Sequence, residues 1–346
     1  MERIRIAVWF LLVVAIYAPL VVAKTTEKYI AVGHYDFPYF SNHDLGTKNS
    51  SITKLVLVIH GIGRNAIDYY NLLYGIAQTA NTLSKTAIVA PHFLCPSDNP
   101  KPPSHVLSFS CDGWLQGLAS VNTNKIYSFT ALDQLLTAGV AAFPHLTEIL
   151  VAGHSAGGQT VQRYGASTTK GKTEVLGTPV KYVAANPGTY MYLDNKRVAH
   201  PAHQHLKSLC PAPGGNECHL TASDFVGPYW NADSCPGYND GKYGLGKPEG
   251  YIASVGRDAV IHQFPKSNFT YLLGDLDTQL GNALDVSCEA NATGYYRKQR
   301  GLIWEKYLYL TQKVSPTTQV FHIVPGCGHN DTCMFQSAAF LAEMNS

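Results

Sequence analysis

A serine set between two glycines is the first group in this 346-residue sequence that could do chemistry. The apolar run 148–152 leads into Gly153, Ser155 and Gly157, which form the pattern Gly-x-Ser-x-Gly, and a helical pattern follows over 158–165. Together these features predict a sharp, strained strand-to-helix turn that exposes the serine, and the glycines leave the room that such a turn requires. Ser155 is therefore the candidate nucleophile for cleaving an acyl bond.

Two backbone amides near this serine are candidates for holding a negative charge. The helix after Ser155 would point its amino end at the reacting centre, so its dipole and the free amide of Ala156 favour a developing oxyanion. An earlier apolar run, 55–60, ends in a turn that begins with Gly61 and Ile62. We predict that the amide of Ile62 is the second donor of the oxyanion hole, with that of Gly61 as the alternative.

A carboxylate and a histidine follow the last two apolar runs. The run 268–273 ends beside Asp275 and Asp277, and the spacing Gly-x-x-Asp favours Asp277 as the acid, whereas Asp275 would cap the turn. The final run, 319–324, leads to His329, which is the candidate base. In such a triad the acid orients the imidazole and the imidazole activates the serine.

The order Ser155, Asp277, His329 is that of the α/β-hydrolase superfamily and differs from the order in the chymotrypsin and subtilisin folds. The sequence resembles this superfamily over nearly the whole predicted mature chain, most clearly in His60–Asn65, Gly153–Tyr164, Tyr271–Thr278 and Val324–Asn330. Three further segments resemble secreted fungal and bacterial hydrolases whose substrates are mostly unassigned, namely 185–190, 243–245 and 284–290. The resemblance implies a mechanism more than a substrate.

The resemblance implies that His329 removes the proton of Ser155 and that Asp277 orients the imidazole. We expect a secreted esterase or lipase-like serine hydrolase that acts on a small-molecule or lipid-like ester through an acyl-enzyme, with no metal or organic cofactor. A secreted serine peptidase and a catalytically inactive binding module of the same fold are the alternatives. The 26 Lys and Arg nearly balance the 24 Asp and Glu, which does not favour nucleic acid as a partner. The sequence identifies no partner protein.

Each of these residues follows an apolar run rich in Val and Ile, so a sheet must position them. The runs alternate with turns and helical patterns, which is typical of a mostly parallel buried sheet with crossover helices. We expect the α/β-hydrolase fold, a mostly parallel twisted sheet with helices on both faces. The expected strands are 55–60, 88–90, 148–152, 181–185, 268–273 and 319–324, and the expected helices are 128–143, 158–165 and 334–344.

One stretch interrupts this alternation. Between 191 and 264, Gly, Pro, Tyr and Cys dominate and strand-like runs disappear. We expect a disulfide-stapled loop or cap insertion over the sheet edge, before the strand that carries the acid. The tyrosines in or beside it could line an acyl pocket or form a small core of their own, and the sequence leaves both alternatives open.

The amino terminus predicts export. Arg3 and Arg5 precede an apolar stretch that ends in small residues before Lys24, which is typical of a secretory signal peptide over 1–23. The hydrolase domain would then be 24–346, with no stable membrane span after cleavage. An uncleaved membrane anchor is the alternative.

Eight cysteines form an even set in a chain predicted to reach an oxidising compartment, and we expect four disulfides. Closeness in sequence suggests certain pairs among the many that eight cysteines allow: Cys95–Cys111, Cys210–Cys218, Cys327–Cys333 and, by remainder, Cys235–Cys288.

Two weaker patterns complete the sequence. Triplets for N-glycosylation begin at Asn49, Asn268, Asn291 and Asn330. We expect Asn330 to stay unmodified, because it adjoins His329 in a tight turn. A local histidine cluster has no carboxylate or cysteine at metal-finger spacing, so we interpret it as part of a solvated loop; it consists of His200, His203 and His205.

Overall fold

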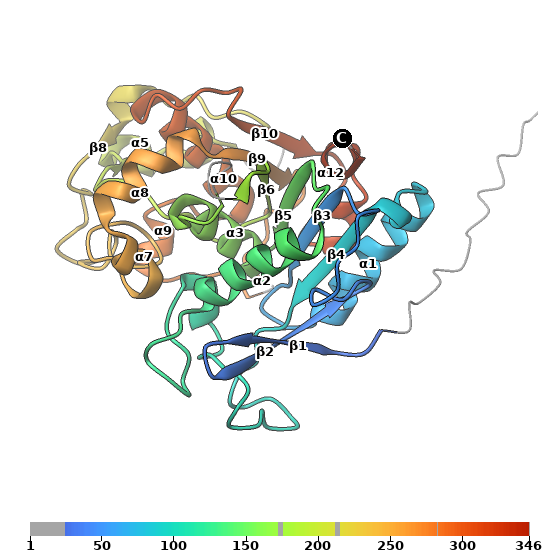
Figure 1. The fold of residues 1–346 in the computed structure, drawn as a ribbon. Coiled ribbons are helices and arrows are strands. Elements are labelled where there is room, and N and C mark those ends of the chain that lie inside the picture. Colours follow the sequence, from blue (N-terminus) through green and yellow to red (C-terminus); the bar gives the residue numbers. More distant parts are fainter. Residues whose placement is uncertain (1–24, 172–175, 212–214, 282, 346) are drawn as a thin grey trace, which may run out of the picture.

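The structure is a computed structural model that describes residues 25–171, 176–211, 215–281 and 283–345. The predicted signal peptide, residues 1–23, lies outside the described residues. Within the described part, an eight-stranded sheet with the order β1-β2-β4-β3-β5-β6-β9-β10 forms the middle of the molecule (Figure 1). Its strands are β1 (Lys28–Val32), β2 (Tyr35–Ser41), β3 (Lys54–Ile59), β4 (Thr86–Pro91), β5 (Glu148–His154), β6 (Val180–Ala185), β9 (Asn268–Gly274) and β10 (Gln319–Val324).

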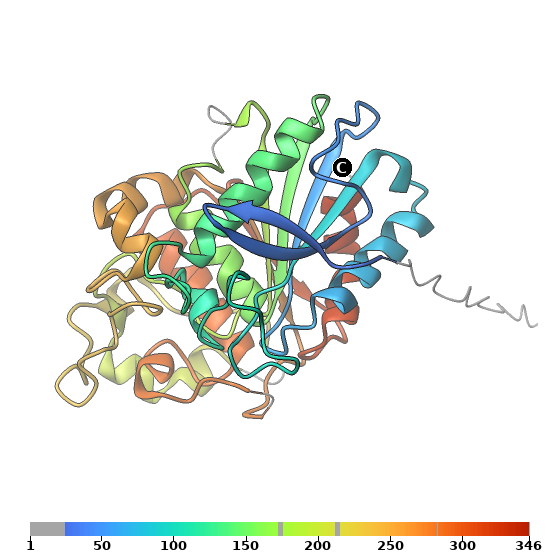
Figure 2. The same ribbon diagram turned by 60° about the horizontal axis from the view of Figure 1, so that its bottom comes forward.

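Strands β4, β3, β5, β6, β9 and β10 are parallel to one another. Each corresponds to one of the apolar runs that the sequence indicates, so the predicted mostly parallel sheet is confirmed. Strands β1 and β2 form an antiparallel hairpin at the edge of the sheet, and β2 also pairs antiparallel with β4. Figure 2 shows this hairpin in dark blue in front of the sheet.

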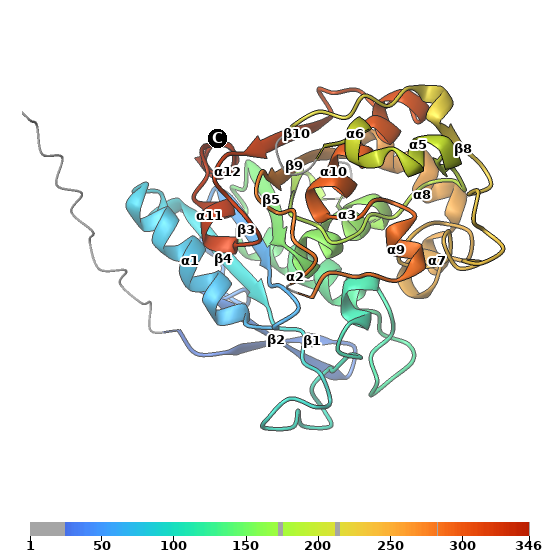
Figure 3. The same ribbon diagram turned by 180° about the vertical axis from the view of Figure 1, so that it is seen from behind.

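Side chains alternate between the two faces of the sheet, and both faces are buried. In β3, Leu55 and Leu57 belong to one core cluster, whereas Val56 and Val58 belong to the other. This alternation is the geometry of an extended strand, and burial on both faces explains the nearly continuous apolar runs. Helices α2, α3 and α10 contribute to the first cluster and α1, α11 and α12 to the second, so helices cover both faces (Figures 1 and 3).

The helices around the sheet agree in part with the predicted ones. Helices α2 and α3 confirm the helical patterns at 128–143 and 158–165, whereas the pattern at 334–344 falls on two helices, α11 and α12, that Gln336 and Ser337 separate. The bounds are α1 (Ala66–Thr79), α2 (Ser128–Ala142), α3 (Ala156–Ser167), α9 (Cys288–Asn291), α10 (Arg297–Lys306), the π-helical turn η5 (Tyr307–Thr311), α11 (Asp331–Phe335) and α12 (Ala338–Asn345).

The stretch 191–264 holds more regular structure than the loop expected from its composition. Its helices have only four to seven residues, too few for a periodic pattern to be visible in the sequence. The elements are β7 (Arg197–Val198), α5 (His200–Gln204), α6 (Leu206–Leu209), η3 (Ala222–Asp224), β8 (Phe225–Val226), α7 (Gly250–Val255), α8 (Arg257–Gln263) and η4 (Phe264–Lys266). Two further 3₁₀ turns lie earlier in the chain, η1 (Leu83–Lys85) and η2 (Gly113–Gln116).

Disulfides tie this stretch and the loops together. All eight cysteines lie in the described part of the chain, and they form the four pairs that the sequence suggests. The Cys210–Cys218 pair closes a loop inside the stretch, and Cys235–Cys288 joins the stretch to α9. Of the helices in the described residues, none is both long enough and apolar enough to cross a membrane.

Candidate active site

The turn that carries Ser155 has strained geometry. Strand β5 ends at His154, helix α3 begins at Ala156, and Ser155 between them has φ +59° and ψ −118°. A Cβ on Gly153 would lie 2.5 Å from the carbonyl carbon of Gly157, and a Cβ on Gly157 would collide with the carbonyl oxygen of Ile59. The glycines are therefore required because α3 packs against the ends of β3 and β5 without room for side chains.

Three predicted residues meet at the carboxyl ends of the parallel strands. His329 Nε2 lies 2.8 Å from Oγ of Ser155, and His329 Nδ1 lies 2.8 Å from Oδ2 of Asp277. The ionised carboxylate can only accept, so Nδ1 carries the proton and Nε2 accepts from the Ser155 hydroxyl. The carboxylate of Asp275 makes no hydrogen bond to His329, and its Oδ1 is buried without a hydrogen-bond partner among the described residues. The structure thus brings Ser155, Asp277 and His329 together and leaves Asp275 outside the group.

Asn186, which the sequence did not single out, ties two of the contributing loops to each other. It follows β6 with φ +44° and is 2% exposed. Its Oδ1 accepts from the backbone N–H of Gly274 at 2.7 Å, and its Nδ2 donates to the carbonyl of Gly328 at 3.0 Å. Gly274 ends the strand before Asp277, and Gly328 precedes His329, so one amide fixes the acid-bearing loop against the histidine-bearing loop.

Arg297, at the start of α10, is a second residue that sequence reasoning missed. Its Nη1 lies 3.6 Å from Oδ1 of Asp277, and the two side chains are only 3% and 2% exposed. Burial lowers the pKa of Arg297, and the neighbouring carboxylate acts in the opposite direction. The carboxylate of Asp277 therefore has a cation on one oxygen and an imidazole on the other.

A second imidazole packs on His329. The ring of His154 lies 4.7 Å from that of His329, centroid to centroid, and its Nδ1 is 3.4 Å from the hydroxyl of Tyr69. Burial holds the pKa of His154 well below its usual value, so this ring is neutral. His154 thus contributes a flat, uncharged surface that limits the orientations of the His329 ring.

The two predicted oxyanion donors lie beside the serine. Ala156 is the first residue of α3, where a backbone N–H has no acceptor within the helix. Ile62 lies in the turn after β3 that the bond from Arg64 N to Gly61 O closes. Both residues line one cavity together with Ser155. Their role in charge stabilisation stays a prediction.

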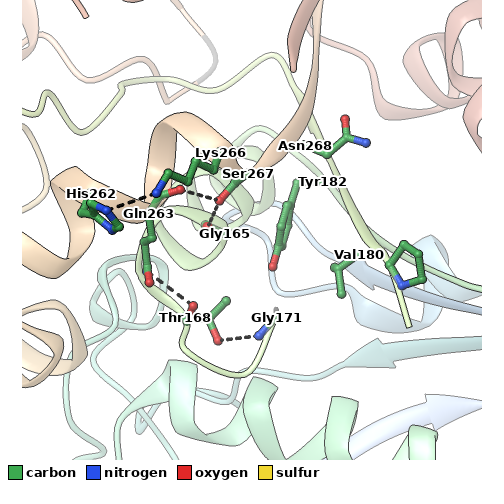
Figure 4. A pocket seen from close by; sticks show the side chains of 11 residues that line it. Gly165, Thr168, Gly171, Val180, Tyr182, His262, Gln263, Lys266, Ser267 and Asn268 are labelled. Carbon is green, nitrogen blue, oxygen red and sulfur yellow. Dashed lines mark hydrogen bonds between the residues drawn. The ribbon is translucent and has the colours of Figure 1, made fainter. Parts of the chain in front are cut away.

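The cavity at Ser155 is small, with a volume of about 130 Å³, and its lining is mixed polar and apolar. Its lining residues are Ile62, Asp112, Leu115, Ser155, Ala156, Gln159, Gly188, Lys242, Ala283, Asp285 and Arg297. A larger cavity of about 440 Å³ lies at the amino ends of β6 and β9, where Figure 4 shows Val180, Asn268 and Lys266 at its wall. Because Ser155 follows the carboxyl end of β5, this larger cavity is at the opposite end of the sheet from Ser155, Asp277 and His329.

The tyrosines of the stretch 191–264 and its flanks pack as core residues. Tyr190 and Tyr192 are fully buried against Trp304, at ring distances of 5.3 and 5.0 Å. Tyr229 and Tyr238 form a separate small cluster with Cys235 and Ala292. Of the tyrosines that the sequence left open, Tyr229 and Tyr238 thus form a small core of their own, whereas Tyr190 and Tyr192 belong to the main core.

The histidine cluster is not a solvated loop throughout. His200 and His203 lie on α5, and His203 is buried with Nε2 at 3.2 Å from the carbonyl of Asn291. The short helix turns His203 inward, which the sequence could not indicate. Within the described residues, one group has the spacing to hold a metal ion, Cys235, Cys288 and Glu289, and its two sulfurs form a disulfide.

Comparison with known proteins identifies the fold. No protein-family profile and no curated protein matches this sequence. The solved structure of poly(aspartic acid) hydrolase-1 from Sphingomonas sp. KT-1 is similar with a TM-score of 0.55 and 18% identity over 90% of this chain and 96% of that one. LpqC, a poly(3-hydroxybutyrate) depolymerase from Bordetella parapertussis, gives a TM-score of 0.57 and 19% identity over 93% and 95%. With its sheet order, this likeness confirms the expected α/β-hydrolase fold.

Proposed function

We propose that this protein is a secreted serine hydrolase that cleaves an acyl bond, and specifically a carboxylic ester. The observation that carries the proposal is the pair of 2.8 Å contacts of His329, one to Ser155 Oγ and one to Asp277 Oδ2. Both are within hydrogen-bonding reach for proton transfer before any substrate is bound. In a catalytically inactive binding module, binding would not require these two contacts to be maintained.

The reaction proceeds through an acyl-enzyme. His329 Nε2 takes the proton of Ser155 as Oγ attacks the carbonyl carbon of the ester, and the amides of Ala156 and Ile62 hold the resulting oxyanion. The tetrahedral intermediate collapses, and His329 returns the proton to the departing alcohol. Water then attacks the acyl-enzyme with His329 again as base, and the carboxylic acid leaves.

The surroundings of the triad favour this chemistry. Once His329 is protonated, its positive charge faces the carboxylate of Asp277, which stabilises the imidazolium. Arg297 on the other carboxylate oxygen and the Asn186 bridge keep Asp277 in place while the charge moves. The base therefore gains a proton without a rearrangement of its neighbours.

Hydrolysis of an acyl bond and export have separate support. The two solved structures described above are named as a hydrolase and as a depolymerase of poly(3-hydroxybutyrate), which is a polyester. Poly(aspartic acid) is a polyamide, so the two names agree with hydrolysis of an acyl bond and do not decide between an ester and an amide. The four disulfides are typical of a protein that folds in an oxidising compartment, which supports export.

The test is labelling with a fluorophosphonate probe, followed by kinetics on nitrophenyl esters and on a peptide nitroanilide. We expect wild type to label and to hydrolyse the esters, and Ser155→Ala to do neither. Ser208→Ala, which removes an exposed hydroxyl on α6, is the matched control and should label like wild type. Folded wild type that does not label would overturn the proposal, and turnover of the nitroanilide alone would make the protein a peptidase.

A further inference from the structure

Apolar, acidic and hydrogen-bond-donating groups line the cavity beside Ser155, and Gln159 is the best defined of the donors. Gln159 lies one helical turn after Ser155, on the same face of α3. Its Oε1 accepts from Arg163 Nη1 at 3.2 Å and from Thr189 Oγ1 at 2.7 Å. A guanidinium can only donate, so Oε1 must face Arg163, and the amide nitrogen Nε2 faces the cavity.

Arg163 fixes this orientation of the Gln159 side-chain amide. It is fully buried, and burial lowers its pKa to about 10, so it stays charged at neutral pH. Its Nη2 donates to Thr189 Oγ1 at 2.9 Å and to the carbonyl of Lys242 at 2.8 Å, and its Nε donates to the same carbonyl at 3.1 Å. One buried side chain thus fixes Gln159 and also the segment that brings Lys242 to the cavity.

Two cations at the cavity face carboxylates of the protein, and Asp112 also lines the cavity as an exposed carboxylate. Lys242 Nζ lies 2.7 Å from Asp285 Oδ2, and Arg297 faces Asp277. The oxygens of Asp285 also accept from the hydroxyl of Tyr243 at 2.7 Å and from Ser287 N at 3.1 Å, so the protein itself uses this acceptor. Burial would raise the pKa of Asp285, but these donors hold it well below its usual value, so it stays ionised. The cations at the cavity are thus paired within the protein, so they do not require an anionic substrate.

The cavity is also short. A dry cavity of about 150 Å³ in another protein holds one benzene molecule, so a volume of about 130 Å³ has room for about five non-hydrogen atoms. A Cβ on Gly188 would lie 3.0 Å from Nε2 of Gln159, so the missing side chain at this position leaves the donor accessible. An alkyl chain in this space would leave Nε2 of Gln159 without an acceptor, and such a loss lowers affinity.

We propose that this cavity selects esters in which the group beside the scissile carbonyl is short, uncharged and carries an oxygen acceptor that binds Nε2 of Gln159. An ether, a hydroxyl or the carbonyl of a second ester supplies such an oxygen. This inference rests on the proposed function, since it names the substrate class of the same serine. Gln159 is then a specificity-determining residue.

The test replaces the N–H donor of Gln159 by an acceptor while the side chain keeps nearly the same shape. Gln159→Glu keeps an oxygen for Arg163 and Thr189 and replaces the N–H donor by a second acceptor. Esters are compared in pairs that differ by one oxygen in place of one CH₂: nitrophenyl methoxyacetate with nitrophenyl butyrate on the acyl side, and methoxyethyl butyrate with butyl butyrate on the alcohol side. The readout is the ratio of kcat/KM within each pair, divided by the same ratio for wild type, so that intrinsic ester reactivity and any general loss of activity cancel.

We expect this double ratio to fall by about tenfold or more in one of the two series, which is the effect of one good hydrogen bond. Gln159→Met, which removes the N–H without adding a charge, should move it in the same direction. Gln78→Glu makes the same change at an exposed position of α1 and should leave the ratio within about twofold. Double ratios near one for Gln159→Glu in both series would overturn the inference while the proposed function stands. Failure of wild type to label or to cleave any ester would instead overturn the proposed function.

Discussion

Replacing Asp277 by asparagine tests the triad at a single pair of atoms. Oδ2 of Asp277 accepts from His329 Nδ1 at 2.8 Å, and Oδ1 faces Arg297 Nη1 at 3.6 Å. Because a guanidinium only donates, the new amide would turn its oxygen to Arg297 and its NH₂ to His329. Nδ1 must then accept, so the ring proton moves to Nε2, and Nε2 can no longer take the proton of Ser155.

The expected loss is large. A wrong imidazole tautomer of this kind lowers kcat by about 10⁴-fold in a serine protease triad, which corresponds to about 5 kcal/mol of transition-state free energy. We expect a loss of that order for Asp277→Asn. Its free energy of unfolding should also fall by about 3 kcal/mol, because the substitution takes a carboxylate away from the charge of Arg297 at a site where both side chains are at most 3% exposed.

Asp275→Asn is the matched control, since it makes the same change two residues earlier, outside the triad. We expect its kcat/KM to stay within about threefold of wild type. The assay is kcat/KM on a short nitrophenyl ester, together with the rate of fluorophosphonate labelling, measured well below the unfolding temperature of each variant. Asp277→Asn with more than a tenth of wild-type activity, or inactivation by Asp275→Asn instead, would refute the reasoning.

Three further predictions follow from the surroundings of the site and the sheet. Changing both Cys327 and Cys333 to alanine opens a loop whose ends are six residues apart. The double substitution should lower the free energy of unfolding by about 2 kcal/mol, and it should lower kcat because His329 lies inside the loop. Unchanged ester kinetics would contradict the expected loss of kcat. Glu148 is half buried, which acts to raise its pKa, but two lysines hold that pKa below its usual value. Glu148→Gln should therefore destabilise by about 1–2 kcal/mol at neutral pH. In denaturant unfolding, the difference from wild type should begin to shrink below about pH 4.3, the ordinary pKa of glutamate, and vanish only below the lowered pKa of the folded state. Asn330 caps α11 through Oδ1, so glycopeptide mass spectrometry of the secreted protein should find it unmodified, and substantial occupancy would count against this.

The sheet was predictable because parallel strands buried on both faces must be apolar throughout. The runs that become β3, β5 and β9 are buried at nearly every position, so composition alone marks them. The hairpin of β1 and β2 was missed because it lies at the edge, where partial exposure mixes polar residues into the pattern, and because Pro38 argues against a strand. Edge strands are therefore harder to predict from hydrophobic patterns than strands in the middle of a sheet.

Helix α10 shows where pattern reasoning fails. Its first four residues, Arg297 to Arg300, are polar yet at most 3% exposed. Arg300 donates hydrogen bonds to the backbone carbonyls of Gly294, Gly188 and Asp285. Its buried guanidinium is therefore satisfied by backbone acceptors. A rule that assigns apolar residues to the buried face cannot find such a helix, because its partners are fixed only in the folded chain.

The same contrast separates the reacting groups from the groups that hold them. Ser155 could be identified from the sequence because a strained turn restricts which residues can flank it, and the resulting pattern spans only five positions. Asn186 lies 142 residues from the carbonyl it holds at Gly328, and Arg163 lies 79 residues from Lys242, so no local pattern records either contact. The proposed triad therefore follows from a short motif in each loop, whereas the cavity proposed to select the substrate depends on how distant segments pack. A change in the segment that carries Lys242 should consequently alter which ester is cleaved while the chemistry at Ser155 stays the same.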